Sequence, residues 1–256
     1  MNLMEAHTPY NPPGCDIDVE NRFRASLTGF DGDPEKVRAA YDEAAAYLSG
    51  VYEDIYEELS NSFDLVITVA DHGELLGEHG FWDHQYGVFP KLTRIPLIVD
   101  DGRTQGSTEE MASLLDVHAT ILAAAGQDEA AEASRGIDIR NHETLAEREQ
   151  PHLTSYHGIG TQTRENLESE GFDTDHLDVD LHGLVFDDDY WYQTFEGTAW
   201  FRPSEKANGD EAVRVDRPEE HLEALLEQLD REETHQFGEM DIDEAVAAQL
   251  NDLGYR

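Results

Sequence analysis

The 256-residue chain is long enough for one large α/β domain or two smaller ones. Its 57 acidic residues outnumber its 17 basic residues, and the formal net charge of −40 argues against binding to nucleic acid or to an anionic membrane surface. That charge is compatible with a disordered acidic chain or with a halophilic protein whose surface repulsion is screened by salt, and the aromatic residues and strong periodicity favour the halophilic, folded interpretation.

The single cysteine, Cys15, excludes an internal disulfide. No apolar run approaches the ~18 residues that a membrane helix needs, and no signal peptide is visible, so we expect a cytoplasmic protein. Residues 2–4 have the pattern of a strand tail, and residues 11–14 (NPPG) enforce an extended loop. Because a natural domain rarely starts inside a buried strand, we expect the chain to be the C-terminal part of a longer protein.

The first long element is a predicted helix. Asp33, Pro34 and Glu35 form a helix start, and apolar residues then recur at three- and four-residue steps to about Leu59. A stripe of tyrosines on this helix is interpreted as packing. The pattern therefore predicts one amphipathic helix that leads into the central stretch of the chain.

That central stretch, residues 64–74 (DLVITVADHGE), is a β-branched run that ends in two potential metal ligands and a glycine. The run predicts a strand buried on both faces. In open α/β sheets ligands bind beyond the carboxyl ends of the strands, so Asp71 and His72 are candidate metal ligands. Gly73 is expected to let the backbone turn sharply. In isolation, an Asp-His-Gly triplet is more typical of a solvated loop.

Two further elements follow. Residues 95–99 predict a short strand, with Pro96 at its start or on a spare edge. Residues 107–110 (STEE) have capping-box spacing, and the apolar face of the next helix is predicted to end at Gly126. His118 lies on that apolar face and is expected to be a buried structural histidine.

The second half of the chain carries weaker signals. Residues 127–150 predict a surface excursion, 151–156 a strand, and 186–201 an aromatic hairpin whose rings suit cross-strand packing or, less often, stacking on a carbohydrate. Helical patterns cover 218–231 and 242–253.

Three motifs occur in a specific order and spacing: residues 69–74 (VADHGE), 76–80 (LGEHG) and 94–99 (RIPLIV). Together they resemble the sulfatase family of the alkaline-phosphatase-like superfamily. The resemblance implies an α/β fold with a mixed or parallel sheet flanked by helices. It assigns residues 1–150 to the C-terminal part of the catalytic domain and 151–256 to a small C-terminal α+β subdomain.

The resemblance also implies roles for four residues. Asp71 and His72 would complete a metal site begun by acidic residues near the N-terminus of the family's domain, and the ion would be Ca²⁺, with Mn²⁺ and Zn²⁺ as alternatives because one ligand is an imidazole. His7 lies in residues 7–10 (HTPY), which match a His-x-Pro-Tyr segment that contacts sulfate. His84 matches a histidine that contacts sulfate or protonates the leaving alcohol. His79 is expected to be structural.

The chain departs from the family in one decisive respect. Sulfatases use a formylglycine made from a Cys/Ser-x-Pro-x-Arg motif, and these 256 residues contain no such motif. Residues 89–91 (FPK) replace the usual Tyr-Glu-Glu. Lys91 could approach an anionic group, but its position does not match the family's lysine. We therefore expect a sulfate-ester hydrolase acting on a small molecule or carbohydrate, inactive as this chain alone. The alternatives are a phosphoester or phosphonate hydrolase, a phosphoryl transferase, an inactive fragment or an acidic binding module.

Overall fold

The computed structural model describes residues 1–15, 17, 33–103, 106–108, 110–140, 145, 151–186, 189–202 and 215–231. The chain divides into two compact units, Met1–Val215 and Asp216–Arg256. The predicted helix at 242–253 lies outside the described residues. In the second unit the predicted helix at 218–231 is confirmed as α8 (Pro218–Arg231). The domain boundary expected at about residue 150 stays a prediction.

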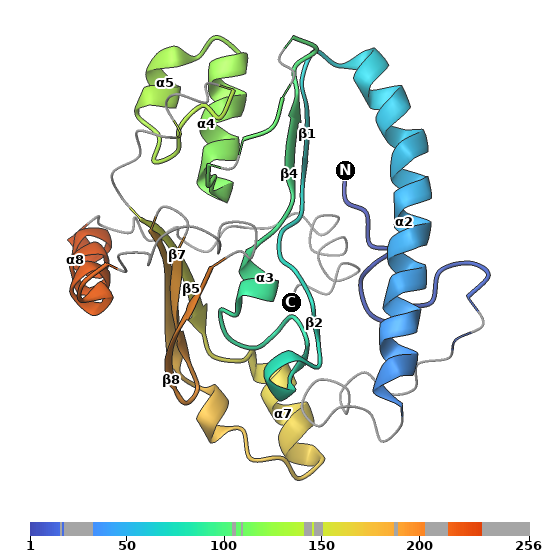
Figure 1. The fold of residues 1–256 in the computed structure, drawn as a ribbon, viewed down its shortest axis with the longest axis vertical. Coiled ribbons are helices and arrows are strands. Elements are labelled where there is room, and N and C mark those ends of the chain that lie inside the picture. The colour runs from blue at the N-terminus through green and yellow to red at the C-terminus, as the bar shows by residue number, and fades with distance from the viewer. Residues whose placement is uncertain are drawn as a thin grey trace, which may run out of the picture. The chain divides into compact units, whose positions relative to one another are not determined.

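The longest element is α2 (Pro34–Ser62), which confirms the predicted helix and extends it by one turn. The Asp33 side chain accepts a hydrogen bond from the backbone N–H of Glu35, and Pro34 occupies the first turn, as their residue types favour. Figure 1 shows α2 running alongside β1 and β4. Tyr52 and Tyr56 join them by hydrogen bonds to Thr68 and Asp100, so the tyrosine stripe does hold the helix in place.

The predicted central strand is β1 (Val66–Val69), and it pairs antiparallel with β4 (Leu97–Asp100), which begins directly after Pro96. The mixed α/β class is confirmed, and every strand pair among the described residues is antiparallel. The expectation that β1 is buried on both faces is wrong. Val69 is 38% exposed and the other three residues are half-buried, because the described strands form a two-stranded ladder here.

Between β1 and β4 the chain folds into a compact loop with four short elements: β2 (Leu75–Leu76), η1 (Glu78–Gly80), β3 (Trp82–Asp83) and α3 (Pro90–Thr93). Strands β2 and β3 pair antiparallel, with Leu75 opposite Asp83. This short ladder places the residues after Gly73 next to those before His84.

Gly73 is required because the backbone of Lys91 approaches it closely, and not because the chain turns sharply there, as the sequence led us to expect. Its φ is not in the left-handed region, but a Cβ atom there would lie 1.9 Å from the backbone oxygen of Lys91. The N–H of Gly73 also donates to the carbonyl of Leu92 at 2.8 Å. The glycine therefore lets α3 pack directly against the backbone that follows Asp71 and His72.

Helix α4 (Leu114–Ala124) begins later than the sequence indicates. Its capping box is formed by Ser113 and Asp116, because Ser113-Leu114-Leu115-Asp116 also has the required spacing. The buried residues are Asp116, Ala119 and Thr120, whereas His118 is exposed, so the prediction of a buried His118 is wrong.

The face of α4 predicted to be apolar and buried is instead open to solvent. Leu114, Leu115 and Ile121 are 48%, 54% and 49% exposed. The opposite face is held by polar contacts to the segment after α5 (Asp128–Glu132), in which Ile137 and Ile139 donate backbone hydrogen bonds to Asp116 and Thr120. Side-chain hydrogen bonds therefore decide which face of α4 is covered.

The second half of the first unit is a four-stranded antiparallel sheet in the order β5-β6-β7-β8. The strands are β5 (His152–His157), β6 (Asp180–Phe186), β7 (Asp189–Thr194) and β8 (Gly197–Phe201). Strand β5 and the β7–β8 hairpin confirm the predictions, while β6 was not predicted. Helix α7 (Thr161–Ser169) and η2 (Asp175–Leu177) connect β5 to β6.

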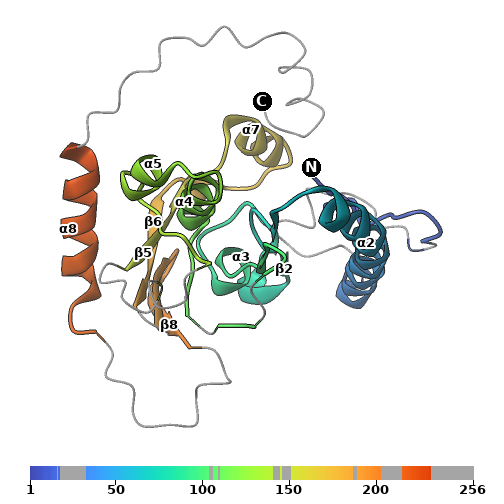
Figure 2. The same cartoon turned by 90° about the horizontal axis from the view of Figure 1, so that it is seen from above.

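One hydrophobic core joins the central loop to this sheet. Tyr86, Phe89 and Leu92 of the loop pack with residues of the sheet and of α7, and the Tyr190 hydroxyl donates to the carbonyl of Val88 at 2.7 Å. Figure 2 shows β2 and α3 beside the sheet. A second cluster packs the α2 residues Ala40 and Ala44 against the β3 residue Trp82.

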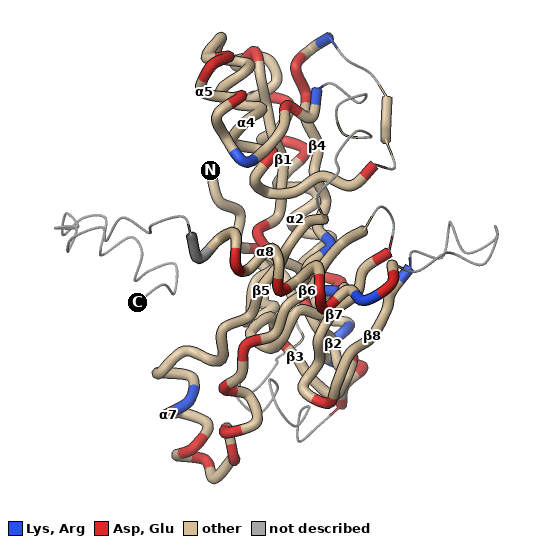
Figure 3. Tube along the Cα trace, turned by 90° about the vertical axis from the view of Figure 1, so that its left-hand side faces the viewer, with Lys and Arg blue, Asp and Glu red and all other residues tan. Residues whose placement is uncertain are grey.

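Charge is spread over the fold. Figure 3 shows Asp and Glu on most of the described elements, with few Lys and Arg among them. The expectation that the chain does not bind nucleic acid stays a prediction. Across the described part of the chain, none of the helices combines the length and apolar character that crossing a membrane requires.

Candidate metal and oxyanion site

The end of β1 delivers the first two candidate residues. Asp71 follows the strand, and its Oδ1 accepts a hydrogen bond from the backbone N–H of His72 at 3.0 Å. The His72 Nδ1 lies 2.9 Å from the carbonyl oxygen of Gly73. A carbonyl oxygen only accepts hydrogen bonds, so in the neutral ring this contact assigns the proton to Nδ1 and leaves the lone pair on Nε2.

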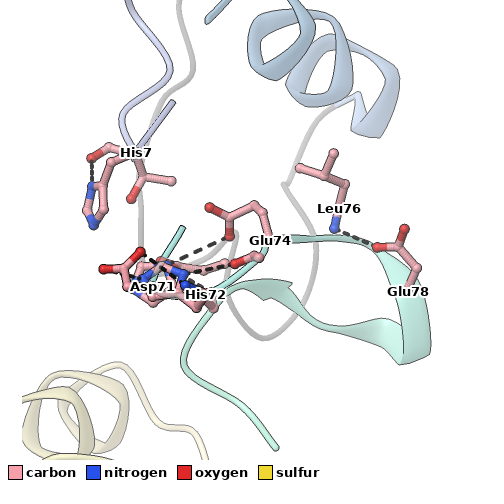
Figure 4. Close-up of polar contacts among 10 residues, drawn as sticks. His7, Asp71, His72, Glu74, Leu76 and Glu78 are labelled. Carbon is pink, nitrogen blue, oxygen red and sulfur yellow. Dashed lines mark hydrogen bonds and ion pairs between the residues drawn. The ribbon is translucent and has the colours of Figure 1, made fainter. Parts of the chain in front are cut away.

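Asp71 and His72 face a common space. The His72 Nε2 lies 3.8 Å from Asp71 Oδ2, and the side chains are 36% and 66% exposed for His72 and Asp71. Figure 4 shows the pair together below the N-terminal segment that carries His7. An anionic oxygen and an imidazole lone pair at this spacing fit part of the coordination sphere of one divalent cation.

The three candidate histidines lie together. The ring of His84 stacks on that of His72 with centroids 4.1 Å apart, and the ring of His7 is 5.2 Å from that of His84. The His7 Nδ1 lies 2.7 Å from the Thr8 carbonyl, which leaves Nε2 as the atom for outside contacts. The structure therefore brings His7, His72 and His84 from three separate segments into one cluster.

His84 is held by two carboxylates. Its Nδ1 lies 2.6 Å from Asp83 Oδ1 and 3.9 Å from Glu74 Oε1, and Asp83 Oδ1 also accepts the backbone N–H of His84 at 2.7 Å. Burial lowers the pKa of His84, but the close contact with Asp83 and the negative charges of Asp83 and Glu74 outweigh it and raise the pKa to about 9. The imidazole is therefore a cation near neutral pH.

Behind the histidines lies an inner acidic layer that sequence reasoning missed. The Asp83 side chain is 3% exposed and that of Glu74 is 8% exposed. Burial, with the charges of Glu74 and Asp83, raises the pKa of the Tyr10 phenol, and burial and Glu74 raise that of Tyr41. Glu74 stands in the VADHGE motif and Asp83 precedes His84, but no spacing rule distinguishes these acids from exposed ones.

The remaining candidates lie outside the cluster. His79 adopts a left-handed φ of 56° in the η1 turn and stacks on Phe89 with ring centroids 4.2 Å apart, and its structural role stays a prediction. Lys91 is exposed on α3 and lines a cleft of about 1040 Å³ together with Asp71, His72 and His84. Arg94 and Arg140 line the same cleft and add cationic groups to it.

Comparison with known proteins gives the family of the segment that carries these residues. The sulfatase family model matches residues 2–127, the segment that carries all four candidate residues. Residues 2–127 belong to the sulfatase family. The prediction from the three motifs is therefore confirmed, and the cluster of His7, Asp71, His72 and His84 lies within the sulfatase domain.

Individual relatives match the chain at low sequence identity and over part of their length. Over 132 residues the chain is 28% identical to the low-salt glycan biosynthesis sulfotransferase Agl7 of Haloferax volcanii, a match that covers 48% of this chain and 31% of that protein. Two solved phosphonate monoester hydrolases are also similar. The Agrobacterium radiobacter protein is 17% identical, with a TM-score of 0.44 over 77% of this chain and 41% of that one. The Silicibacter pomeroyi protein is 19% identical, with a TM-score of 0.46 over 81% and 43%.

This chain thus spans less than half the length of each of these proteins.

Proposed function

We propose that this sulfatase domain takes part in the metal-dependent hydrolysis of sulfate esters of a small molecule or carbohydrate. The observation that carries the proposal is the convergence of His7, His72 and His84, with Asp71 beside His72. Asp71, His72 and His84 also line one cleft. Three imidazoles around a common space suit the recognition of a tetrahedral oxyanion, and the acid beside them suits a cation.

The proposed metal ligands are Asp71 and His72, because both direct a donor atom into the same space. When bound, a divalent cation would neutralise charge on the sulfate oxygens and orient the attacking group. Ca²⁺ is our first candidate, by analogy with the family. Mn²⁺ and Zn²⁺ remain alternatives, because an imidazole ligand suits them. The nucleophile is sought outside these 256 residues, since they hold no formylglycine motif.

His84 and His7 act on the ester itself in this proposal. As an imidazolium whose Nδ1 faces Asp83, His84 presents its Nε2–H to a sulfate oxygen or to the leaving alkoxide. His7 presents Nε2 from the opposite segment. His84 donates a hydrogen bond to charge that builds as the S–O bond breaks. Because its Nδ1 faces the Thr8 carbonyl, His7 adds a second donor from Nε2 only when its ring is an imidazolium.

A second candidate reaction is transfer of the sulfuryl group to a sugar hydroxyl instead of water. It is favoured by the similarity of 132 residues of the chain to a protein named as a glycan-biosynthesis sulfotransferase. The same contacts serve both reactions, because they differ only in the group that accepts the sulfuryl.

The test uses sulfate as a probe of the site. Binding of inorganic sulfate to the full chain is measured by calorimetry with and without Ca²⁺, for the wild type and for Asp71→Ala and His84→Gln. We expect both substitutions to weaken binding, whereas the matched control His118→Gln, which alters an exposed histidine on α4, leaves it unchanged. Equal binding by all four proteins would contradict the proposal.

Reaction type is tested separately. The coding sequence upstream of Met1 is read for an in-frame Asp-Asp pair and a Cys/Ser-x-Pro-x-Arg motif, and the polypeptide that contains them is assayed. Faster release of 4-nitrophenol from the aryl sulfate than from the aryl phosphate supports sulfate chemistry, and the reverse ratio favours a phosphoester hydrolase. Appearance of a sulfated sugar when a sugar is added as acceptor identifies transfer.

A further inference from the structure

The inner acidic layer behind the histidines is the feature that the proposed function does not use. Glu74, Asp83 and His84 each offer one ligand atom, and these atoms all lie within 4.8 Å of one another. Two ligands on opposite sides of one divalent cation stand about 4–5 Å apart, twice a typical metal–ligand distance. The three groups therefore have the spacing of ligands around one ion.

A second, independent observation points to a ligand at this place. The Glu74 side chain is 8% exposed, and among the described residues its Oε1 accepts no hydrogen bond. That atom faces His84 Nδ1 at 3.9 Å, which is beyond hydrogen-bonding distance. A buried carboxylate oxygen without a donor is costly, and a cation would satisfy it.

We propose that Glu74, Asp83 and His84 form a site for a divalent cation such as Mn²⁺ or Zn²⁺, in which the ion replaces the Nδ1 proton of His84 and that proton is released to solvent. This site is separate from the one proposed at Asp71 and His72 and goes beyond it. Two carboxylates and one imidazole are a mixed oxygen and nitrogen donor set, which suits these ions better than the all-oxygen set that Ca²⁺ and Mg²⁺ prefer.

The local fold supports such a site. The β2–β3 ladder pairs Leu75 with Asp83, which fixes the spacing between the segment of Glu74 and that of His84. His84 stacks on His72, so the two proposed ion sites are neighbours. An ion in the inner site would hold the His84 ring in the orientation in which it faces the cleft.

The probe is Mn²⁺, because the electron paramagnetic resonance signal of the free ion disappears when the ion binds. The full chain is titrated in molar potassium chloride, which suppresses diffuse binding to the many surface acids. We expect Glu74→Gln to lower the Mn²⁺ affinity of one class of sites by at least about tenfold. Loss of a residue that only supports a metal ligand already lowers affinity by about 10–100-fold, and Glu74 would itself be a ligand. The matched control Glu196→Gln, at an exposed turn, should bind as the wild type does.

Two further measurements separate this site from the proposed function. Asp71→Asn should leave the inner class of sites in place, and if it abolishes all Mn²⁺ binding while Glu74→Gln has no effect, the inner site is refuted. In the wild type, Mn²⁺ bound at the inner site should broaden the amide NMR signals of Leu75 and Asp83 more than that of Asp71. This readout needs no variant, so the proposal stays testable if Glu74→Gln does not fold, and the opposite order of broadening would overturn it.

Discussion

Asp116 provides the sharpest test of how this domain is held together, because it is a fully buried carboxylate that serves two separate segments. Its Oδ2 accepts the backbone N–H of Ser113 at 2.7 Å and its Oδ1 accepts that of Ile137 at 2.9 Å. Asp116→Ala leaves both N–H groups without this acceptor. Hydrogen bonds to a charged group contribute about 1.5–3 kcal/mol each. Removal of the carboxylate also removes the cost of burying its charge, which offsets part of that loss. We therefore expect the free energy of unfolding to fall by about 3 kcal/mol.

The assay is equilibrium unfolding in urea at constant salt, with the midpoint and slope fitted together. Asp116→Asn keeps one acceptor oxygen and should lose about half as much, since one of the two N–H groups remains bonded. As a control, Asp54→Ala on the exposed face of α2 should change the free energy of unfolding by less than about 0.5 kcal/mol. A loss below about 1 kcal/mol for Asp116→Ala would show that the two segments do not depend on this side chain.

Three other outcomes are expected. Gly183→Ala should destabilise the sheet by about 1–3 kcal/mol in the same assay, because its Cβ would lie 2.1 Å from the Tyr190 hydroxyl, whereas Gly160→Ala meets open space and serves as the control. In the chain freed of metal by a chelator, the raised pKa of His84 stabilises the folded state. This contribution is complete below about pH 6.5 and is lost as the pH rises through about 9. NMR titration should show this pKa, and Asp83→Asn should lower it. Finally, potassium chloride should raise the urea midpoint, because it screens the net charge of −40, and a falling midpoint would contradict the halophilic interpretation.

Periodicity and capping rules predicted the elements whose stability is local. The Asp33 cap fixed the start of α2, Pro96 preceded β4, and the β7–β8 hairpin followed from its aromatic pattern and its Gly197 turn. The motif around Asp71 and His72 located the end of β1 correctly. In each case the deciding interactions are between residues close in sequence.

What could not be predicted depends on partners distant in sequence. The face of α4 was assigned from its leucines, but hydrogen bonds from Ile137 and Ile139 cover the Asp116 and Thr120 face. The inner acidic layer also needs the β2–β3 ladder to bring Glu74 next to Asp83 and His84. Strand β6 was not predicted because Gly183 interrupts its alternation of apolar and polar residues. The glycine is needed there because a Cβ atom would collide with the side chain of Tyr190.

The open leucine and isoleucine face of α4 sets a limit on the salt that this chain tolerates. Excluded salts strengthen contacts between apolar surfaces. In dilute buffer the carboxylates repel one another without screening. In concentrated salt the exposed Leu115 and Ile121 of separate molecules are expected to associate. Solubility of the purified chain is therefore expected to pass through a maximum at intermediate ionic strength.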